Sequence, residues 1–266
     1  MTPSDSSSPS QSSGSVLRRI YHALPGPIRR SVQPLAHWLR LRLEPESRAR
    51  LAWMREHYSK FGVDIREQVF LSIARFCHIN RPIDGYYFEF GSHGARTMRL
   101  CWKHTRHLFD WTYVSFDSFE GLPEITEIDR QQIWAKGRLK TAEEDFVATV
   151  TGAGMPRERL RTVKGFYDDT LTDALAETLL PSKAAAIYID CDLYASTVPV
   201  LKFIKPFLQP GTIIAFDDWN CFIGDPDRGE RLAWREFTEA NPGLRFEPFV
   251  ANNEVQSFIF IGSREG

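Results

Sequence analysis

Long apolar runs and cysteine pairs are both missing from this sequence. No stretch approaches the ~18 consecutive apolar residues that a membrane helix needs, and the N-terminus is too serine-rich and polar for the apolar part of a signal peptide. The spacing of the four cysteines matches neither a zinc-ligand pair nor a small disulfide framework; they are Cys77, Cys101, Cys191 and Cys221. We therefore expect a cytoplasmic protein without a transmembrane span.

Net charge is also nearly absent, at −1 from 33 basic and 34 acidic residues. This balance argues against a nucleic-acid partner, because such binding uses a broadly positive surface. The charge is unevenly distributed, since residues 1–42 carry six arginines and one acid and are +5, whereas the remainder is −6. No internal repeat is present.

The chain of 266 residues is 42% hydrophobic and 25% charged, which is enough to bury one sizeable core. We expect three parts: a disordered serine-rich leader at 1–16, a helical arm or lid at 17–80, and one domain at 81–266. The basic part of the arm mixes arginine and apolar residues at helical spacing. It is either a patch for a membrane surface or anionic ligand, or a helical segment whose arginines are solvated or pair with the acidic body, and we favour the second.

Beyond residue 81, short apolar runs alternate with amphipathic segments, after a helical stretch at about Pro45–His78. Alternating strands and helices predict a mainly parallel sheet with helices on both faces. The last two strands are joined by only five residues, which suits an antiparallel hairpin. The expected strands are Tyr86–Phe90, Thr112–Phe116, Leu160–Val163, Ala184–Ile189, Thr212–Phe216, Arg245–Val250 and Gln256–Ile261, and the expected helices are Thr97–Thr105, Ala142–Thr151, Leu171–Leu179, Thr197–Phe207 and Gly229–Ala240. This α/β, Rossmann-like, seven-stranded arrangement is typical of class I S-adenosylmethionine-dependent methyltransferases.

Ligands of open parallel sheets bind beyond the carboxyl ends of the strands, so polar residues there are candidates for a site. The first strand brings Glu89 to its end, followed by Gly91-Ser92-His93-Gly94-Ala95-Arg96-Thr97. Glycines allow a tight turn close to a ligand, and Glu89 could accept a hydrogen bond from a cationic amino group. The turn lacks G-x-G-x-x-G, which counts against a nicotinamide dinucleotide but is compatible with S-adenosylmethionine. His93 is either a base or, as we favour, a loop residue that only hydrogen-bonds backbone.

The second strand ends at Asp117, followed by Ser118. An acid at this point can accept both hydroxyls of a ribose, although it could also cap a turn; its position favours the ribose. After the third strand, Gly165-Phe166 could wall the adenine, or Phe166 could belong to the core, and both interpretations remain open.

Four carboxylates follow the fourth and fifth strands: Asp190 and Asp192, then Asp217 and Asp218. Adjacent parallel strands would bring them to one edge of the sheet, where they repel one another unless a cation neutralises them. Oxygen ligands suit a hard divalent cation, and Mg²⁺ is the natural choice. The alternative is that some of these acids only cap the following helices. The sheet-edge argument favours the metal.

Four motifs in order resemble the macrocin O-methyltransferase family over roughly Phe88 to Phe260: Ser118–Pro123, Gly165–Leu171, Asp190–Thr197 and Gly211–Trp219. The resemblance implies S-adenosylmethionine as donor, a sugar hydroxyl of a natural product as acceptor, and Mg²⁺ held by one fourth-strand Asp with the fifth-strand pair. The sequence departs from the family in the placement of the turn glycines and in a longer, polar segment at Cys221–Arg228.

These considerations define the expected site. Metal ligands are sought among Asp190, Asp192, Asp217 and Asp218. Either Asp190 or Asp192 is the ligand from the fourth strand, and the other, or a nearby water, takes the proton of the acceptor hydroxyl. The residues expected at the cofactor are Glu89, Gly91, Ser92, His93, Gly94, Thr97, Asp117, Ser118, Gly165, Phe166 and Asp190. Left open are a metal-independent methyltransferase, a non-catalytic nucleotide-binding module that docks through its basic arm, and a homo-oligomer formed through that arm.

Overall fold

The computed structural model describes residues 65–80 and 83–264. They belong to one compact unit that begins at Ile65. The expected leader at 1–16 and most of the arm expected at 17–80 lie outside the described residues. None of the described helices combines the length and the apolar character that a membrane crossing needs.

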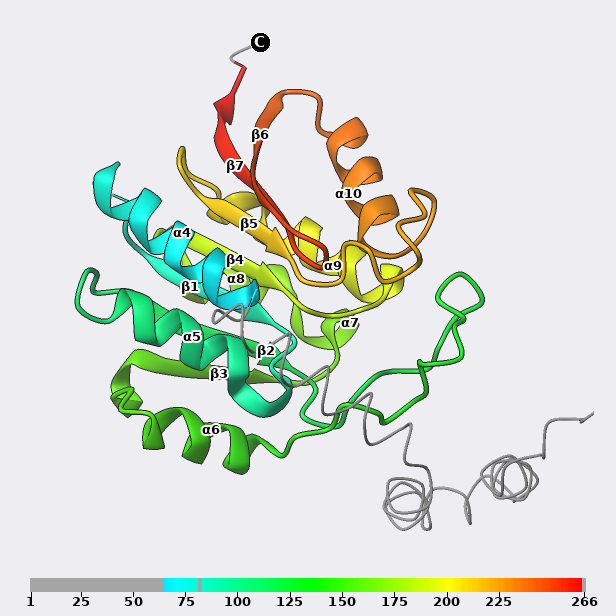
Figure 1. Ribbon diagram of the computed structural model, residues 1–266, viewed down its shortest axis with the longest axis horizontal. Helices are drawn as coiled ribbons and strands as arrows, with labels where there is room; N and C mark the ends of the chain where they lie inside the picture. Colours follow the sequence, from blue (N-terminus) through cyan, green and yellow to red (C-terminus); the bar gives the residue numbers. More distant parts are fainter. Residues whose placement is uncertain (1–64, 81–82, 265–266) are drawn as a thin grey trace, which may run out of the picture. The chain divides into compact units, whose positions relative to one another are not determined.

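The sheet has seven strands in the order β3-β2-β1-β4-β5-β7-β6 (Figure 1). Strands β1 to β5 are parallel, and β7 runs antiparallel to both β5 and β6. The predicted fold class is therefore confirmed. The strand bounds are Tyr86–Phe90 (β1), Thr112–Asp117 (β2), Leu160–Lys164 (β3), Ala184–Ile189 (β4), Ile213–Phe216 (β5), Leu244–Ala251 (β6) and Gln256–Ser263 (β7).

The helices are Ile65–Ile79 (α4), Arg96–Thr105 (α5), Glu143–Gly152 (α6), Tyr167–Thr170 (α7), Asp173–Leu179 (α8), Tyr194–Ile204 (α9) and Gly229–Ala240 (α10). Two predicted helices differ from those observed. The one expected at Leu171–Leu179 is a helix of seven residues whose start is fixed by Thr172, because its side chain accepts from the N–H of Leu175. The one expected at Thr197–Phe207 starts earlier, at Tyr194, and ends in a 3₁₀ turn that contains Pro206.

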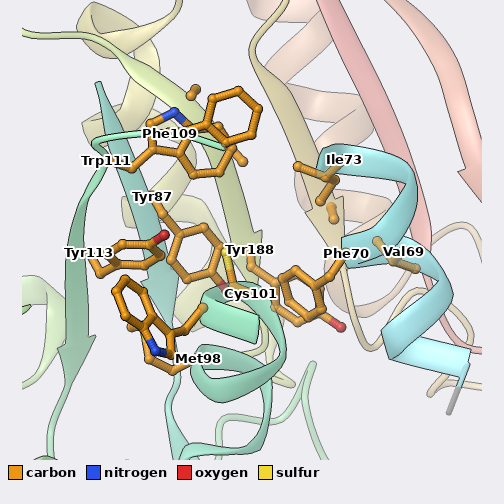
Figure 2. Close-up of a cluster of buried hydrophobic side chains, with 14 of the residues drawn as sticks. Val69, Phe70, Ile73, Tyr87, Met98, Cys101, Phe109, Trp111, Tyr113 and Tyr188 are labelled. Atoms are coloured by element: carbon orange, nitrogen blue, oxygen red, sulfur yellow. The ribbon is translucent and has the colours of Figure 1, made fainter. Parts of the chain in front are cut away.

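Alternation of side chains along the strands divides the core between the two faces of the sheet. Helices α4, α5 and α6 cover one face, and α8, α9 and α10 the other (Figure 1). Tyr87, Tyr113 and Tyr188 point to the first face, where Phe70 of α4 stacks on Tyr188 at 4.9 Å between ring centroids (Figure 2). Val69, Phe70 and Ile73 are all buried there. Helix α4 is therefore a part of the same core as the sheet.

Successive strands are added to one side of β1 as far as β3 and to its other side from β4 onward. Chain connections leave the sheet there in opposite directions, which opens a crevice at the carboxyl ends of the strands. The turns that follow β1, β2, β3 and β4 all reach this crevice. The fold thus places the predicted strand-end residues beside one another.

Candidate active site

A pocket of about 290 Å³ lies at the carboxyl ends of β1, β2, β3 and β4. Its wall contains most of the residues that the sequence places at a cofactor, with one group from each strand end. It also contains Asp192 and, from the segment between β2 and α6, several apolar residues. The expected residues in the wall are Gly91, Ser92, His93, Asp117, Ser118, Gly165, Phe166 and Asp190.

The turn after β1 depends on Gly91. This residue has a φ of +86°, and a Cβ added to it would lie 1.8 Å from the carbonyl oxygen of Asp190. Only glycine therefore lets the β1 turn pass so close to the end of β4. Gly91 also lines the pocket, and its role at a cofactor stays a prediction.

Asp117 organises the turns around the end of β2. Its Oδ2 accepts from the N–H of Ser92 at 2.7 Å, and its Oδ1 from the N–H of Phe119 at 2.6 Å. Each carboxylate oxygen can accept a second hydrogen bond, so both oxygens can still receive the hydroxyls of a ribose. Burial raises the pKa of Asp117 above its usual value, while the two N–H groups favour the ionised form.

Glu89 is fully buried and is not part of the pocket wall. Its Oε2 accepts from the hydroxyl of Tyr87 at 2.5 Å, whereas its Oε1 has no hydrogen-bond partner among the described residues. Burial raises the pKa of Glu89 to about 8. A buried acceptor without a partner is uncommon, and this one suits the amino group of a ligand. The cofactor role of Glu89 stays a prediction.

Gly94 and Thr97 also lie outside the pocket wall, and their roles likewise stay predictions. Thr97 is buried at the start of α5. The N–H of Gly94 donates to Oγ1 of Thr141 at 3.1 Å, and the same hydroxyl lies 3.0 Å from Nδ1 of His93. His93 is thus hydrogen-bonded to a side chain of the segment that follows β2 and not to backbone, and its role stays a prediction.

The four carboxylates after β4 and β5 separate into a triad and a single acid. Asp190, Asp217 and Asp218 each place an oxygen within 4.8 Å of the other two. Asp192 is outside this set, lines the pocket, and donates its backbone N–H to Oδ2 of Asp218 at 3.2 Å. Burial and mutual repulsion raise the pKa of Asp190 and Asp192, and that of Asp218 to about 6. Asp192 is not one of the three acids that meet at one point, but its carboxylate lies close enough to that of Asp218 for the repulsion to raise its pKa.

Two residues that the sequence did not identify bind Asp217. Arg66 of α4 donates to both of its carboxylate oxygens, with Nε 2.7 Å from Oδ1, and the hydroxyl of Tyr188 donates to Oδ1. Arg66 also pairs with Glu254 at 3.0 Å. Arg66 and Asp217 are 151 positions apart, so no local pattern could have linked them.

The triad fits a divalent cation. It offers hard oxygen donors from three acids at one point, which is the ligand type that Mg²⁺ takes. Arg66 brings a positive charge to Asp217, but Oδ2 of Asp217 keeps a lone pair for a further partner. Asp190 belongs both to the triad and to the pocket wall, so a cation at the triad and a ligand in the pocket would be neighbours.

The segment between β2 and α6 forms the outer part of the pocket wall through Leu122, Pro123 and Leu139. It contacts the polar segment Cys221–Arg228 that the sequence marked as unusual. Arg228 donates to the carbonyl oxygens of Ile128 and Arg130, and Gln131 donates to that of Cys221. The part of this segment that follows the Ser118–Pro123 motif thus lies against Cys221–Arg228.

The family model for macrocin-O-methyltransferase (TylF) matches residues 83–242. The chain belongs to the macrocin-O-methyltransferase family. The matched range runs from before β1 into the residues after α10 and includes the whole pocket and the carboxylate triad. The family resemblance carried by the four sequence motifs is confirmed.

Curated relatives match part of the chain. One relative is 33% identical over 109 residues, which are 39% of this chain and 40% of the relative. It is 8-demethyl-8-(2,3-dimethoxy-alpha-L-rhamnosyl)-tetracenomycin-C 4′-O-methyltransferase from Streptomyces olivaceus. Mycinamicin III 3″-O-methyltransferase from Micromonospora griseorubida is 28% identical over 41% of this chain and 44% of the relative. The chain therefore spans about two fifths of the length of the curated relatives that it matches.

Solved structures agree on the fold. The O-methyltransferase NovP superposes with a TM-score of 0.58 at 21% identity, covering 75% of this chain and 80% of NovP. The calicheamicin methyltransferase CalS11 superposes with a TM-score of 0.55 at 21% identity, covering 97% of this chain and 98% of CalS11. At this identity the likeness supports the class I Rossmann-like fold and nothing finer.

Proposed function

We propose that this family member transfers a methyl group from S-adenosylmethionine to a hydroxyl of a sugar or a related polyhydroxylated natural product, with the assistance of Mg²⁺. The observation that carries the proposal is the position of Asp190. It stands in the wall of the donor pocket and in the carboxylate triad at once, so the methyl donor and the cation that binds the acceptor would meet at one residue.

The donor half of the site follows from the strand ends. Asp117 accepts the ribose hydroxyls with the lone pairs that its two backbone partners leave. The turn at Gly91 and Ser92 lets the backbone approach the methionyl part, and Gly165 with Phe166 borders the adenine. Glu89 offers its unpaired Oε1 to the amino group. All of these assignments are proposals for the residues present in this chain.

The acceptor half uses the separation of the four carboxylates. Asp190, Asp217 and Asp218 hold the cation, and Asp192 takes the proton, because it lines the pocket and lies outside the triad. When bound, S-adenosylmethionine supplies the methyl group and Mg²⁺ lowers the pKa of the acceptor hydroxyl. The acceptor oxygen gains the bond to the methyl carbon, the sulfur–methyl bond breaks, and the proton passes to the carboxylate of Asp192.

A sugar-like acceptor is favoured by the names of the relatives, one of which acts on a rhamnosyl tetracenomycin and another on mycinamicin III. We also propose a cytoplasmic location and a homo-oligomer formed through the basic arm. The proposed parts of the chain are 1–16, 17–80 and 81–266. The absence of a nucleic-acid partner rests on the charge argument alone.

Two measurements test this function. Calorimetry should show binding of S-adenosylmethionine and S-adenosylhomocysteine, and a screen across glycosides, phenols and lipid-linked sugars should show release of S-adenosylhomocysteine with a glycoside. Failure to bind either nucleoside would contradict the enzyme and favour the docking module. Release with phenols alone would keep the methyltransferase but reject the sugar acceptor.

A further inference from the structure

Glu230 is a fifth carboxylate beside the triad, and neither the sequence motifs nor the proposed function uses it. It lies in the first turn of α10 and is only 1% exposed. Its Oε2 accepts from the backbone N–H of Asp218 at 3.0 Å. Its Oε1 is buried and has no hydrogen-bond partner among the described residues.

An acid in the first turn of a helix ordinarily interacts with the free N–H groups of that turn or with water. Glu230 instead reaches back 12 positions to the backbone of a triad residue. The residue before the helix, Arg228, makes no side-chain cap. Helix capping therefore does not account for the burial of this carboxylate.

The surroundings of Glu230 are acidic. Asp190, Asp192, Asp217 and Asp218 all interact with it electrostatically, and each of these interactions is repulsive. A buried carboxylate oxygen that lacks a donor and faces other carboxylates is costly. The arrangement becomes favourable when a positive ion and its hydrogen-bond donors are present at the triad.

We propose that Glu230 is a positioning residue for the divalent cation at Asp190, Asp217 and Asp218. Oε2 fixes the backbone of Asp218, and Oε1 accepts a hydrogen bond from a water molecule on the cation. Mg²⁺ in proteins usually keeps several waters, and partners that hold the ligands and waters from outside strongly affect metal affinity. This inference rests on the metal assignment in the proposed function.

The direct test is the Glu230→Gln variant, which keeps the side-chain shape and an oxygen that can accept from Asp218. Glu239→Gln is the matched control, because Glu239 lies on the same helix and is exposed. Isothermal titration of the full-length protein with Mg²⁺, and with Mn²⁺ as a second probe, should show affinity at least about tenfold weaker for Glu230→Gln. The control should bind like the unchanged protein.

Thermal unfolding of the same proteins separates positioning from a packing role. The metal-free Glu230→Gln variant should melt at the same or a higher temperature than the unchanged protein, because it removes a buried ionisable group whose charged form the neighbouring carboxylates disfavour. Its stabilisation by added metal should be smaller. A lower melting temperature with undiminished metal binding would overturn the inference.

The two levels of failure are distinguishable. If the unchanged protein binds the metal and Glu230→Gln binds it equally well, the role of Glu230 is refuted and the metal site is kept. No metal binding by the unchanged protein refutes the metal assignment and this inference together.

Discussion

The carboxylate of Asp117 holds both the turn after β1 and the turn after β2. One residue therefore shapes the pocket and offers hydrogen-bond acceptors to a ligand. Its oxygens hold the N–H groups of Ser92 and Phe119. The ribose assignment uses the lone pairs that remain on both carboxylate oxygens. An asparagine at this position would offer acceptor lone pairs on one oxygen only. The residue thus gives a direct test of the donor site.

Asp117→Asn should weaken binding of S-adenosylhomocysteine by roughly ten- to a hundredfold, because hydrogen bonds to a charged group contribute about 1.5–3 kcal/mol. The dissociation constant is measured by calorimetry, with circular dichroism to verify folding. Asp145→Asn, an exposed change on α6, is the control and should leave binding unchanged. Equal affinity of Asp117→Asn and the unchanged protein would remove the ribose role.

Glu89 predicts a pH dependence of stability. Burial raises its pKa in the folded chain from 4.5 to about 8. Between these values the folded state binds more protons than the unfolded state, so the free energy of unfolding should fall as pH rises. Glu89→Gln removes this contribution.

Urea unfolding at pH 5 and pH 8 should therefore show a smaller loss of stability in Glu89→Gln than in the unchanged protein. The difference should be on the order of a few kcal/mol. Glu247→Gln, exposed on β6, should behave like the unchanged protein. Identical pH slopes in Glu89→Gln and the unchanged protein would show that Glu89 does not titrate in this window.

Sequence alone could locate Asp117 and the four acids after β4 and β5, because strand period and strand ends are local properties. It could not place Arg66 or Glu230 at the same site. Their partners are set by how α4 and α10 pack on the sheet, and both residues otherwise look like ordinary polar residues near helix starts.

At the scale of elements, the segment between β2 and α6 is tied to the start of α9 by Asp129. This side chain is fully buried. It accepts from the N–H groups of Tyr194 at 2.7 Å and Ala195 at 3.2 Å, and from the hydroxyl of Thr126 at 2.9 Å. Asp129 thus caps the start of α9 from a distant segment. This helix start lies two residues after Asp192. The early start of α9 follows from this cap, which no pattern near Tyr194 predicts.

Asp129→Ala should lower the free energy of unfolding by about 1–2 kcal/mol, the usual cost of losing a helix cap, and should speed trypsin cleavage at Lys136 and Arg138. Glu127→Ala is the control from the same segment, because Glu127 is exposed and its ion pair with Arg130 lies at the surface. Urea titration and timed proteolysis measure the two effects. Equal cleavage rates for both variants would mean that Asp129 does not hold the segment.

Over the whole chain, the sheet and its helices followed from the alternation of apolar segments, and the helical stretch expected at about Pro45–His78 includes most of α4. The expected boundary at residue 81 assigns α4 to the arm. Its buried residues Val69, Phe70 and Ile73 share the core with Tyr87 and Tyr188 (Figure 2), so the packing favours a boundary at Ile65.

Two shortened chains decide between these boundaries. A chain of residues 65–266 should melt cooperatively, whereas one of residues 85–266 should not, because losing a single buried Phe costs about 3–5 kcal/mol out of a typical 5–15 kcal/mol. Far-ultraviolet circular dichroism during heating measures both. A cooperative melt of residues 85–266 would return α4 to the arm.

Methyl transfer assisted by a divalent cation at Asp190, Asp217 and Asp218 can be measured as S-adenosylhomocysteine release from one preparation in two states. Protein dialysed against a chelator should release none above background with S-adenosylmethionine and a glycoside acceptor. Added Mg²⁺ should restore release. An undiminished rate in the chelator-treated protein would contradict the account.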